Sequence, residues 1–136
     1  VKEVFAVIKE FRSGMIFDGD EPVSFGLSAG HIELNETPET AAKREVLEET
    51  GLDIADKNLI FLAESYVSPG FTNEKHYHYL AKIDIDKLDL LSTFGVDDES
   101  IQVCLIHKKD VLSMIQNKQI NTSYLIVGLL IAMSIT

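Results

Sequence analysis

Residues 30–52 read GHIELNETPETAAKREVLEETGL, and this stretch decides the fold that we expect. Thr37 is suited to cap a helix, Pro38 to occupy its first position and Gly51 to end it. Proline lacks the N–H that the first helical turn leaves unbonded, and glycine tolerates the left-handed backbone that ends many helices. The stretch therefore predicts a helix over Pro38–Thr50, preceded by a loop.

Three carboxylates, those of Glu45, Glu48 and Glu49, crowd one face of this predicted helix. At 100° per residue, Glu45 lies about 40° from Glu49 and about 60° from Glu48. Like charges four residues apart destabilise a helix, and so do anions in its second half. A cluster of hard oxygen donors is what Mg²⁺ or Mn²⁺ binds, and Arg44 can reach Glu48 to hold its carboxylate. The fragment alone is more typical of a solvated helix face, so the longer pattern has to decide.

The composition fits one globular domain over residues 1–136. The chain is 46% hydrophobic and 25% charged, with a net charge of −10. It shows no basic stripe, so we expect no nucleic-acid partner. An anionic substrate would need a local reversal of charge, which bound divalent cations supply. The single cysteine, Cys104, cannot form an intrachain disulfide, and the first residues lack a signal-peptide pattern, so we expect a cytoplasmic protein.

The hydrophobic pattern predicts the other elements. Strands are expected at Val4–Phe11, Val23–Ser28, Leu59–Val67, His76–Ile83 and Ile101–Ile106, and helices at Lys108–Asn117 and Thr122–Met133. The segment Asp84–Glu99 is interpreted as a long acidic connection of functional interest. The apolar run Tyr124–Met133 is half the length of about 20 residues that a membrane span needs, so it predicts a buried helix. Strands and helices without strict alternation predict an α/β (α+β) fold with helices packed on a mixed sheet.

Two histidines, His76 and His78, alternate with tyrosines on one of these predicted strands. Residues two apart on a strand share a face, so the pair could bind a metal ion. No third ligand with zinc-like spacing lies near them in the sequence. We therefore expect the two rings to line one face of a sheet.

The longer pattern around the helix resembles the Nudix box. The box positions are filled by Gly30, Glu36, Arg44, Glu45, Val46, Glu48, Glu49, Gly51 and Leu52, each with the expected residue type and spacing. The resemblance implies an α/β/α sandwich around a mixed sheet. It also implies hydrolysis of a nucleoside diphosphate linked to another group, with Mg²⁺ or Mn²⁺ as the cofactor.

The resemblance also implies a role for each polar box residue. Glu45 and Glu49 look like direct metal ligands, and Glu48 looks like a further ligand or a catalytic carboxylate beside the metal. Arg44 looks like the residue that orients the glutamates. Glu36 looks like a residue that fixes the loop, not a ligand.

Segments outside the box resemble the ADP-ribose pyrophosphatase and nucleotide-sugar branch of the family, over roughly residues 4–131. The similar elements are Phe11-Arg12, Ser28-Ala29-Gly30, the turn Ser68–Phe71 and the segment Val96–Val103. Glu10 replaces the usual glutamine, and Ser28 replaces the usual proline. Because a main-chain carbonyl is independent of the side chain before it, the departure at Ser28 leaves the implied metal contact of the Ala29 carbonyl in place.

The same resemblance implies three further roles. Glu99 is expected to act as the general base, with Asp98 and Asp97 as the other candidates in that acidic segment. Arg12 is a candidate phosphate contact, because a guanidinium suits that geometry, although a surface arginine at a strand end is equally consistent. Phe71 is a candidate for stacking on a nucleotide base, although aromatic residues at strand ends are more often part of a core.

The leading interpretation is a pyrophosphatase that acts on ADP-ribose or a related nucleotide sugar. GDP-mannose and UDP-glucose remain open as substrates, because the branch elements are shared. A non-catalytic nucleotide-sensing module is the alternative from another class, although no box carboxylate is lost. Members of the branch usually carry an N-terminal β-rich extension that exchanges between subunits. No such segment is visible in the 136 residues, so a missing start, a homodimer of another kind and a monomer all remain open.

Overall fold

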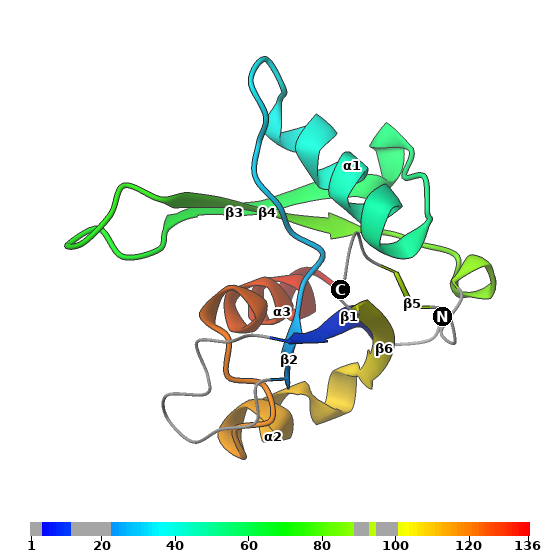
Figure 1. The fold of residues 1–136 in the computed structure, drawn as a ribbon. Helices are drawn as coiled ribbons and strands as arrows, with labels where there is room; N and C mark the ends of the chain where they lie inside the picture. The colour runs from blue at the N-terminus through cyan, green and yellow to red at the C-terminus, as the bar shows by residue number, and fades with distance from the viewer. Residues whose placement is uncertain (1–3, 12–22, 89–92, 95–100) are drawn as a thin grey trace.

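The structure is a computed structural model that describes residues 4–11, 23–88, 93–94 and 101–136 (Figure 1). The strands are β1 (Val4–Phe11), β2 (Val23–Gly26), β3 (Leu59–Tyr66), β4 (Lys75–Ala81), β5 (Thr93–Phe94) and β6 (Ile101–His107). The α-helices are α1 (Pro38–Thr50), α2 (Val111–Gln116) and α3 (Ser123–Ile135). Short 3₁₀ turns lie at Asp56–Asn58, Ile85–Lys87 and Lys108–Asp110.

The first helix, α1, has the bounds that the sequence predicts. The Thr37 side chain accepts a hydrogen bond of 3.2 Å from the Thr40 N–H at the N-terminus. Gly51 ends the helix with a φ of 75°, and its N–H donates to the Leu47 carbonyl at 2.9 Å. Both caps satisfy backbone groups that a helix end otherwise leaves unbonded.

The strands form two sheets, one of four strands in the order β2-β1-β6-β5 and one consisting of the β3–β4 hairpin. Val7 of β1 and Ile106 of β6 belong to the main core, while Ile8, the next residue along β1, and its partner Val103 on β6 are buried as well. Because successive strand residues face opposite sides, both faces of the four-stranded sheet are covered. The expected α/β fold class is confirmed. Every strand pair in the described ranges is antiparallel, however, whereas we expected parallel and antiparallel pairs together.

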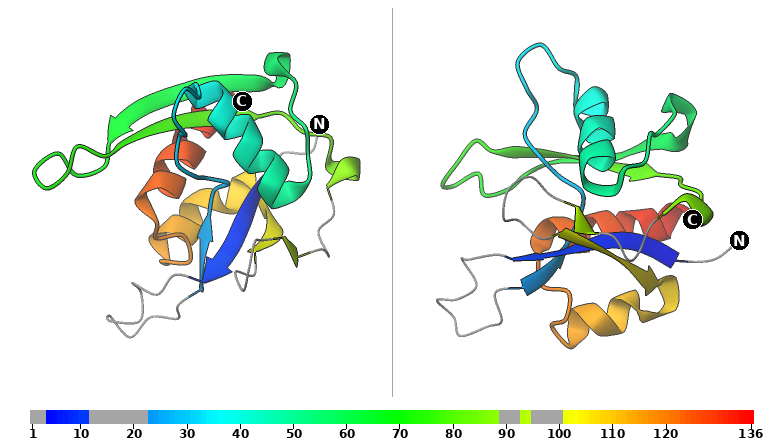
Figure 2. Two further views of the ribbon diagram at one scale, coloured as in Figure 1. Left: turned by 45° about the horizontal axis from the view of Figure 1, so that its top comes forward. Right: turned by 45° about the vertical axis from the view of Figure 1, so that its right-hand side comes forward.

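The main core joins the four-stranded sheet to the two C-terminal helices. Its buried members are Val7, Ile106, Val111, Ile120, Leu125 and Leu129. The apolar run near the C-terminus is thus a buried helix, as predicted, with Leu125 fully buried. In the part of the chain that the structure describes, no helix is long and apolar enough to cross a membrane. Helix α3 contacts both β2 and the β3–β4 hairpin, so it fills the space between the two sheets (Figure 2).

The β3–β4 hairpin carries α1 on one side and α3 on the other (Figures 1 and 2). The Tyr79 hydroxyl on β4 donates a 2.9 Å hydrogen bond to the Glu39 carboxylate in the first turn of α1. Burial and this bond raise the pKa of Tyr79 to about 12. The ring of Tyr79 also packs edge-on against Phe61 of β3, at 5.7 Å between centroids. These contacts fix the N-terminal part of α1 on the hairpin.

The two histidines of β4 line the face that α3 covers, as predicted. His78 is 6% exposed and forms a 3.1 Å hydrogen bond with the Ser65 hydroxyl of β3. The ring of His76 packs edge-on against His78 and against Tyr124 of α3. Burial lowers the pKa of His78, and the neighbouring His76 lowers it further.

Two features of the structure differ from the sequence expectations. The predicted acidic connection includes the 3₁₀ turn Ile85–Lys87 and the strand β5, which pairs with β6. A strand of two residues is too short to show a hydrophobic period. The predicted helix Lys108–Asn117 is a 3₁₀ turn followed by α2, because its first residues are polar and exposed or half-buried while Val111 is fully buried.

The buried His78 predicts a loss of stability in mild acid. Its folded pKa lies below the ordinary value of 6.5, so the unfolded chain binds a proton more readily than the native protein. The free energy of unfolding should be highest above about pH 6.5 and fall as the pH is lowered from there. Urea denaturation between pH 7.5 and 5 should show this fall, and it should be smaller in H78Q. The exposed histidine His107 supplies the control: H107Q should follow the wild-type curve. If the free energy of unfolding fell by the same amount with pH in wild type and in H78Q, His78 would not be the cause of the fall.

Candidate functional site

Arg44 on α1 is the centre of the site. Its Nε and Nη2 donate to the two carboxylate oxygens of Glu36, at 2.8 and 3.0 Å, and Nη2 also donates to the His31 carbonyl at 2.9 Å. The ion pair with Arg44 and the bond from the Glu33 N–H lower the pKa of Glu36 to about 2. The carboxylates of Glu36 and Glu45 raise the pKa of Arg44 above its usual value. The two bonds from Nε and Nη2 to the Glu36 carboxylate form a fork between Arg44 and Glu36. This fork fixes the loop before α1 to the helix.

The loop itself is folded by its own backbone. The Glu36 N–H donates to the Glu33 carbonyl, and the Glu33 N–H donates back to the Glu36 carboxylate, each at 3.0 Å. Asn35 between them has a φ of 65°, in the left-handed region that asparagine tolerates better than most residues. This turn presents the Glu36 carboxylate to Arg44. The predicted role of Glu36 in fixing the loop agrees with this geometry.

The third nitrogen of the guanidinium contacts the box glutamates. Nη1 of Arg44 lies 2.7 Å from Glu45 Oε1 and 3.4 Å from Glu48 Oε2. The sequence predicted the contact with Glu48 from the spacing of four residues, and the structure adds the shorter contact with Glu45. Arg44 thus touches three carboxylates at once and orients two of those expected to bind metal.

Gly30 makes room for one of these carboxylates. A Cβ atom built at Gly30 would overlap with the Glu45 carboxylate, so glycine at this position leaves open the space that the carboxylate now occupies. The chain neighbour of Gly30 is Ala29, whose carbonyl is the expected metal contact. The loop segment and the carboxylate face of α1, which are 15 residues apart in the sequence, therefore meet at this point.

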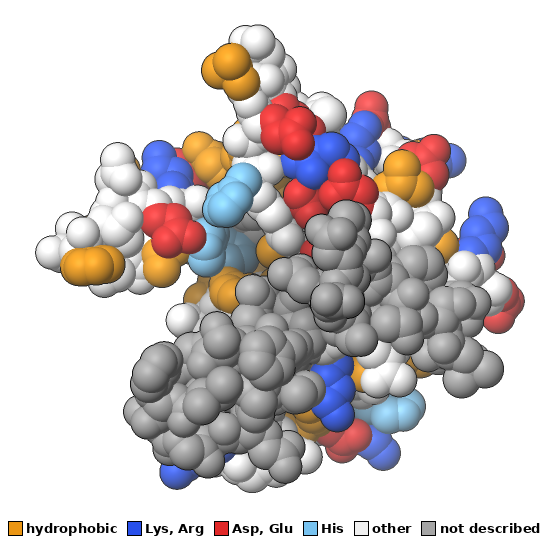
Figure 3. Space-filling view, in the orientation of Figure 1, with side chains coloured by type: hydrophobic (Ala, Val, Ile, Leu, Met, Phe, Trp, Pro, Cys, Tyr) orange, Lys and Arg blue, Asp and Glu red, His pale blue; other side chains and the backbone are white. Residues whose placement is uncertain are grey.

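The face around Arg44 is strongly acidic. The half-buried Glu49 follows Glu45 by one turn, and its Oε2 atom is enclosed by the protein. In the part of the chain that the structure describes, the guanidinium of Arg44 contacts three of the carboxylates on this face, those of Glu36, Glu45 and Glu48. The neighbouring cation, Lys43, pairs with Asp56 instead. Acidic and basic side chains gather over α1 and the loop before it in Figure 3. Carboxylates gathered on one face are the donors that a divalent cation binds.

The donor atoms on this face are of the type that a hard divalent ion binds. Carboxylate and main-chain carbonyl oxygens are the donors that Mg²⁺ and Mn²⁺ take, and Gly30 provides a cradle in which the Glu45 carboxylate fits. Within the described ranges, no three His, Cys, Asp or Glu side chains converge closely enough to hold a metal ion. Two of the box carboxylates, those of Glu45 and Glu48, are directed at Nη1 of Arg44 instead.

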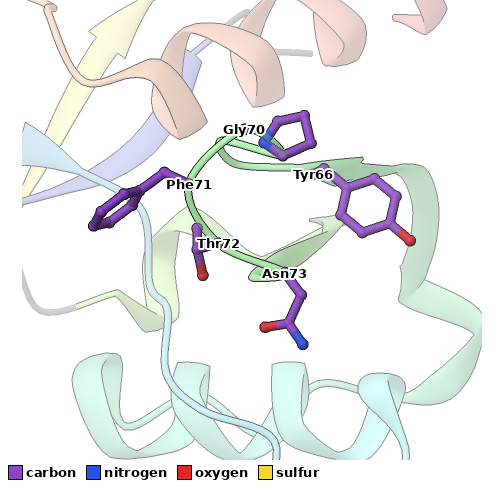
Figure 4. A pocket seen from close by; sticks show the side chains of 6 residues that line it. Tyr66, Gly70, Phe71, Thr72 and Asn73 are labelled. Carbon is purple, nitrogen blue, oxygen red and sulfur yellow. The ribbon is translucent and has the colours of Figure 1, made fainter.

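The remaining predicted site residues are not part of this loop and helix. Phe71 lies in the turn between β3 and β4, where its side chain is 90% exposed. It borders a shallow hollow that is lined by Tyr66, Pro69, Gly70, Phe71, Thr72 and Asn73. The rings of Phe71 and Tyr66 point in different directions there (Figure 4). Arg12 and the candidate bases Glu99, Asp98 and Asp97 lie outside the described residues.

Two supporting contacts were missed by sequence reasoning. One is the main-chain carbonyl of His31, which carries no side-chain signal. The other is the hydrogen bond between Tyr79 and Glu39, which joins elements 40 residues apart in the sequence. The alternation of His76–Ile83 placed Tyr79 on a strand, but only the packing of β4 under α1 shows its partner.

The fold of the chain is similar to that of a solved protein structure. A solved structure described as "Crystal structure of ADP compounds hydrolase" superimposes with a TM-score of 0.76 over 97% of this chain and 65% of the other. The two sequences are 23% identical, so this likeness concerns the fold alone.

The chain belongs to the Nudix family, whose domain model matches residues 5–124. Proteins of this family generally use divalent metal ions. Among similar proteins are the GDP-mannose pyrophosphatases of Escherichia coli K12, 29% identical over 119 residues, and of Citrobacter koseri, 28% identical over the same length. The matched region is 88% of this chain but 61% of each relative, so the chain spans about three-fifths of their length.

The close approach of Gly30 to Glu45 predicts that a substitution at Gly30 changes the geometry of the site but hardly changes the stability of the protein. In G30A, the new methyl group should displace the Glu45 carboxylate, because the flexible end of that side chain yields more readily than the loop backbone. A crystal structure should show the contact between Arg44 and Glu45 lost and the fork on Glu36 retained. The melting temperature should change by less than about 4 °C.

Gly70 provides the matched control, because a Cβ there meets no atom within 4 Å. G70A should leave both the Glu45 position and the melting temperature as in the wild type. An unchanged Glu45 position in G30A would show that the loop, not the carboxylate, adapts.

Proposed function

We propose that this protein hydrolyses the diphosphate bond of a nucleoside diphosphate sugar. The products are a nucleoside monophosphate and a sugar phosphate, and the reaction depends on Mg²⁺ or Mn²⁺. The observation that carries the proposal is the complete Nudix box, in which Arg44 joins Glu36, Glu45 and Glu48 in one network. The names of the relatives and the family match support the same class of reaction.

The cation site consists of carboxylates on α1 and a carbonyl from the loop before it. We assign Glu45, Glu49 and Glu48 as the side-chain donors, and the carbonyl of Ala29 as the main-chain donor. When bound, the metal neutralises the diphosphate and lowers the pKa of a bound water. Without such a cation, the acidic face would repel the substrate, because the protein carries a net charge of −10.

The protein's own residues position the reacting groups. Arg44 orients Glu45 and Glu48, and Gly30 allows the loop to approach them. Glu99 is assigned as the base that takes a proton from the attacking water, and Asp98 and Asp97 are the other candidates in the same segment. Arg12 is assigned to a substrate phosphate and Phe71 to the nucleotide base.

The identity of the sugar nucleotide is the finer part of the proposal. The flanking elements of the sequence favour ADP-ribose or a close relative. The relatives named GDP-mannose pyrophosphatase favour GDP-mannose as the second candidate. UDP-glucose is the third. A module that senses a nucleotide without hydrolysing it is the remaining alternative, and the intact box carboxylates count against it.

We also propose that residues 1–136 act as one domain, that the protein resides in the cytoplasm and that it forms a homodimer. Light scattering across a concentration series tests the dimer, because a monomeric mass of 15.2 kDa at all concentrations would exclude it.

The first functional prediction concerns the substrate and the metal. Incubation with Mg²⁺ and, separately, ADP-ribose, GDP-mannose and UDP-glucose should release phosphomonoesters from at least one of them. E49Q should lower the rate and raise the Mg²⁺ concentration needed for half-maximal rate, because it removes a charged oxygen donor. K43Q, which removes a cation that pairs with Asp56, should leave the rate of product release within about twofold of wild type. Nucleotide binding without product release would favour the sensing module.

The second functional prediction concerns the base. E99Q should lower turnover by about 10²–10⁴-fold while the melting curve stays unchanged, because an amide cannot accept the proton from water. D98N and D97N are the matched controls and should remain active. Full activity of E99Q would remove Glu99 from the mechanism, and loss of activity in one of the control variants would identify the base instead.

A further inference from the structure

We propose that the hydroxyl group of Ser28 belongs to the cation site, where it accepts a hydrogen bond from a water molecule on the bound divalent ion. This inference deepens the proposed function and rests on it, because it requires a divalent ion at the acidic face of α1. Ser28 acts on the ion through the water, so it is a positioning residue and not a ligand. Proline, the usual residue of the related branch at this position, has no hydroxyl, so the contact is a property of this chain.

The Ser28 hydroxyl is enclosed by the protein without a hydrogen-bond partner. Its Oγ atom is buried, and in the part of the chain that the structure describes it forms no hydrogen bond. Other serine hydroxyls are bonded: that of Ser65 to His78 and that of Ser113 to the Asp110 carbonyl. A buried hydroxyl that loses its contacts with water and gains no partner destabilises the folded chain. Such atoms are uncommon, and they indicate a bound molecule or ion.

The position of Ser28 in the chain brings it close to the proposed cation donors. Ser28 directly precedes Ala29, whose carbonyl we assigned to the cation, and it lies two residues before Gly30. A Cβ atom at Gly30 would overlap with the Glu45 carboxylate. Consecutive Cα atoms are about 3.8 Å apart, so the Cα atoms of Ser28 and Gly30 are at most about 7.6 Å apart. A hydroxyl acts on an ion about 5 Å away through one water, so Ser28 is close enough for this role.

The segment around Ser28 is held by packing on both sides. Before it, Leu27 packs against α3, where a Cβ atom built at Gly128 would lie 3.1 Å from Leu27 Cδ1. After it, Gly30 lies against the Glu45 carboxylate. A hydroxyl with fixed flanks can orient a water molecule at little cost in freedom, as residues beside metal ligands do.

A serine hydroxyl is chemically suited to a water on a divalent ion. Mg²⁺ keeps several of its waters when a protein binds it, and Mn²⁺ takes the same kinds of oxygen donor. Waters on such an ion are polarised, so their protons are strong donors, and the oxygen of a hydroxyl accepts one of them. This acceptor is neutral, so it adds no further charge to the acidic face. Residues that hold a metal site in this indirect way change its affinity about 10–100-fold.

Binding of Mn²⁺ in the absence of substrate tests the inference independently of activity. Electron paramagnetic resonance measures the free ion, and S28A should bind Mn²⁺ about tenfold more weakly than wild type. Cation-free S28A should melt at the wild-type temperature or above it, because the substitution removes the unpartnered hydroxyl. S113A is the matched control. The Ser113 hydroxyl lies on α2, where it donates to the Asp110 carbonyl at 2.9 Å, so its removal should leave Mn²⁺ affinity unchanged.

A crystal structure of the wild-type protein with Mn²⁺ gives the direct test. It should show a water on the ion within about 3.2 Å of Ser28 Oγ. Equal Mn²⁺ affinities of S28A and wild type, or a bound ion with no water at Oγ, would overturn the role of Ser28 and leave the proposed function standing. A lower melting temperature of cation-free S28A would assign the hydroxyl to the fold and would also overturn the inference. Absence of Mn²⁺ binding by the wild type at millimolar concentration would overturn both.

Discussion

The fork between Arg44 and Glu36 is the constraint on which the rest of the site depends. It joins the helix that carries the acidic face to the loop that carries Gly30, and the bond from Arg44 to the His31 carbonyl adds a second link between them. The pairing lowers the pKa of Glu36 to about 2, so the carboxylate stays ionised well below its usual range. The pairing is complete above about pH 4.5, and its stabilising effect is lost as the pH falls toward 2.

The fold, in contrast, is held by burial and not by charge. Val7, Val111, Ile120 and Leu125 are almost completely removed from water. Each such side chain contributes about 1.5–3 kcal/mol, whereas an exposed ion pair contributes about 0–1 kcal/mol. The four side chains lie on β1, α2, α3 and the segment between those helices, away from α1. Changes to the box carboxylates should therefore alter chemistry with little effect on folding.

The sequence predicts local features well and long-range pairing poorly. The bounds of α1 followed from Thr37, Pro38 and Gly51, because caps act within one turn. The contact between Arg44 and Glu48 followed from helical spacing. The antiparallel order of the strands did not follow, since a hydrophobic period indicates a strand without naming its partner. The pairing of Tyr79 with Glu39 and the overlap of a Cβ at Gly30 with Glu45 need the packed structure, because they join segments that the chain brings together only on folding.

The space at Gly30 that the Glu45 carboxylate fills bears on how such a domain can evolve. Every codon for glycine is one base change away from codons for residues that carry a Cβ, and any of these side chains would meet the Glu45 carboxylate. Because the obstacle is the end of a flexible side chain and not the backbone, such a change would spare the fold. A single point mutation would thus displace a carboxylate that we propose as a metal donor and leave a stable protein. The same step in reverse would return the carboxylate to its place, so a protein with the proposed donor in position and one without it are a single base change apart.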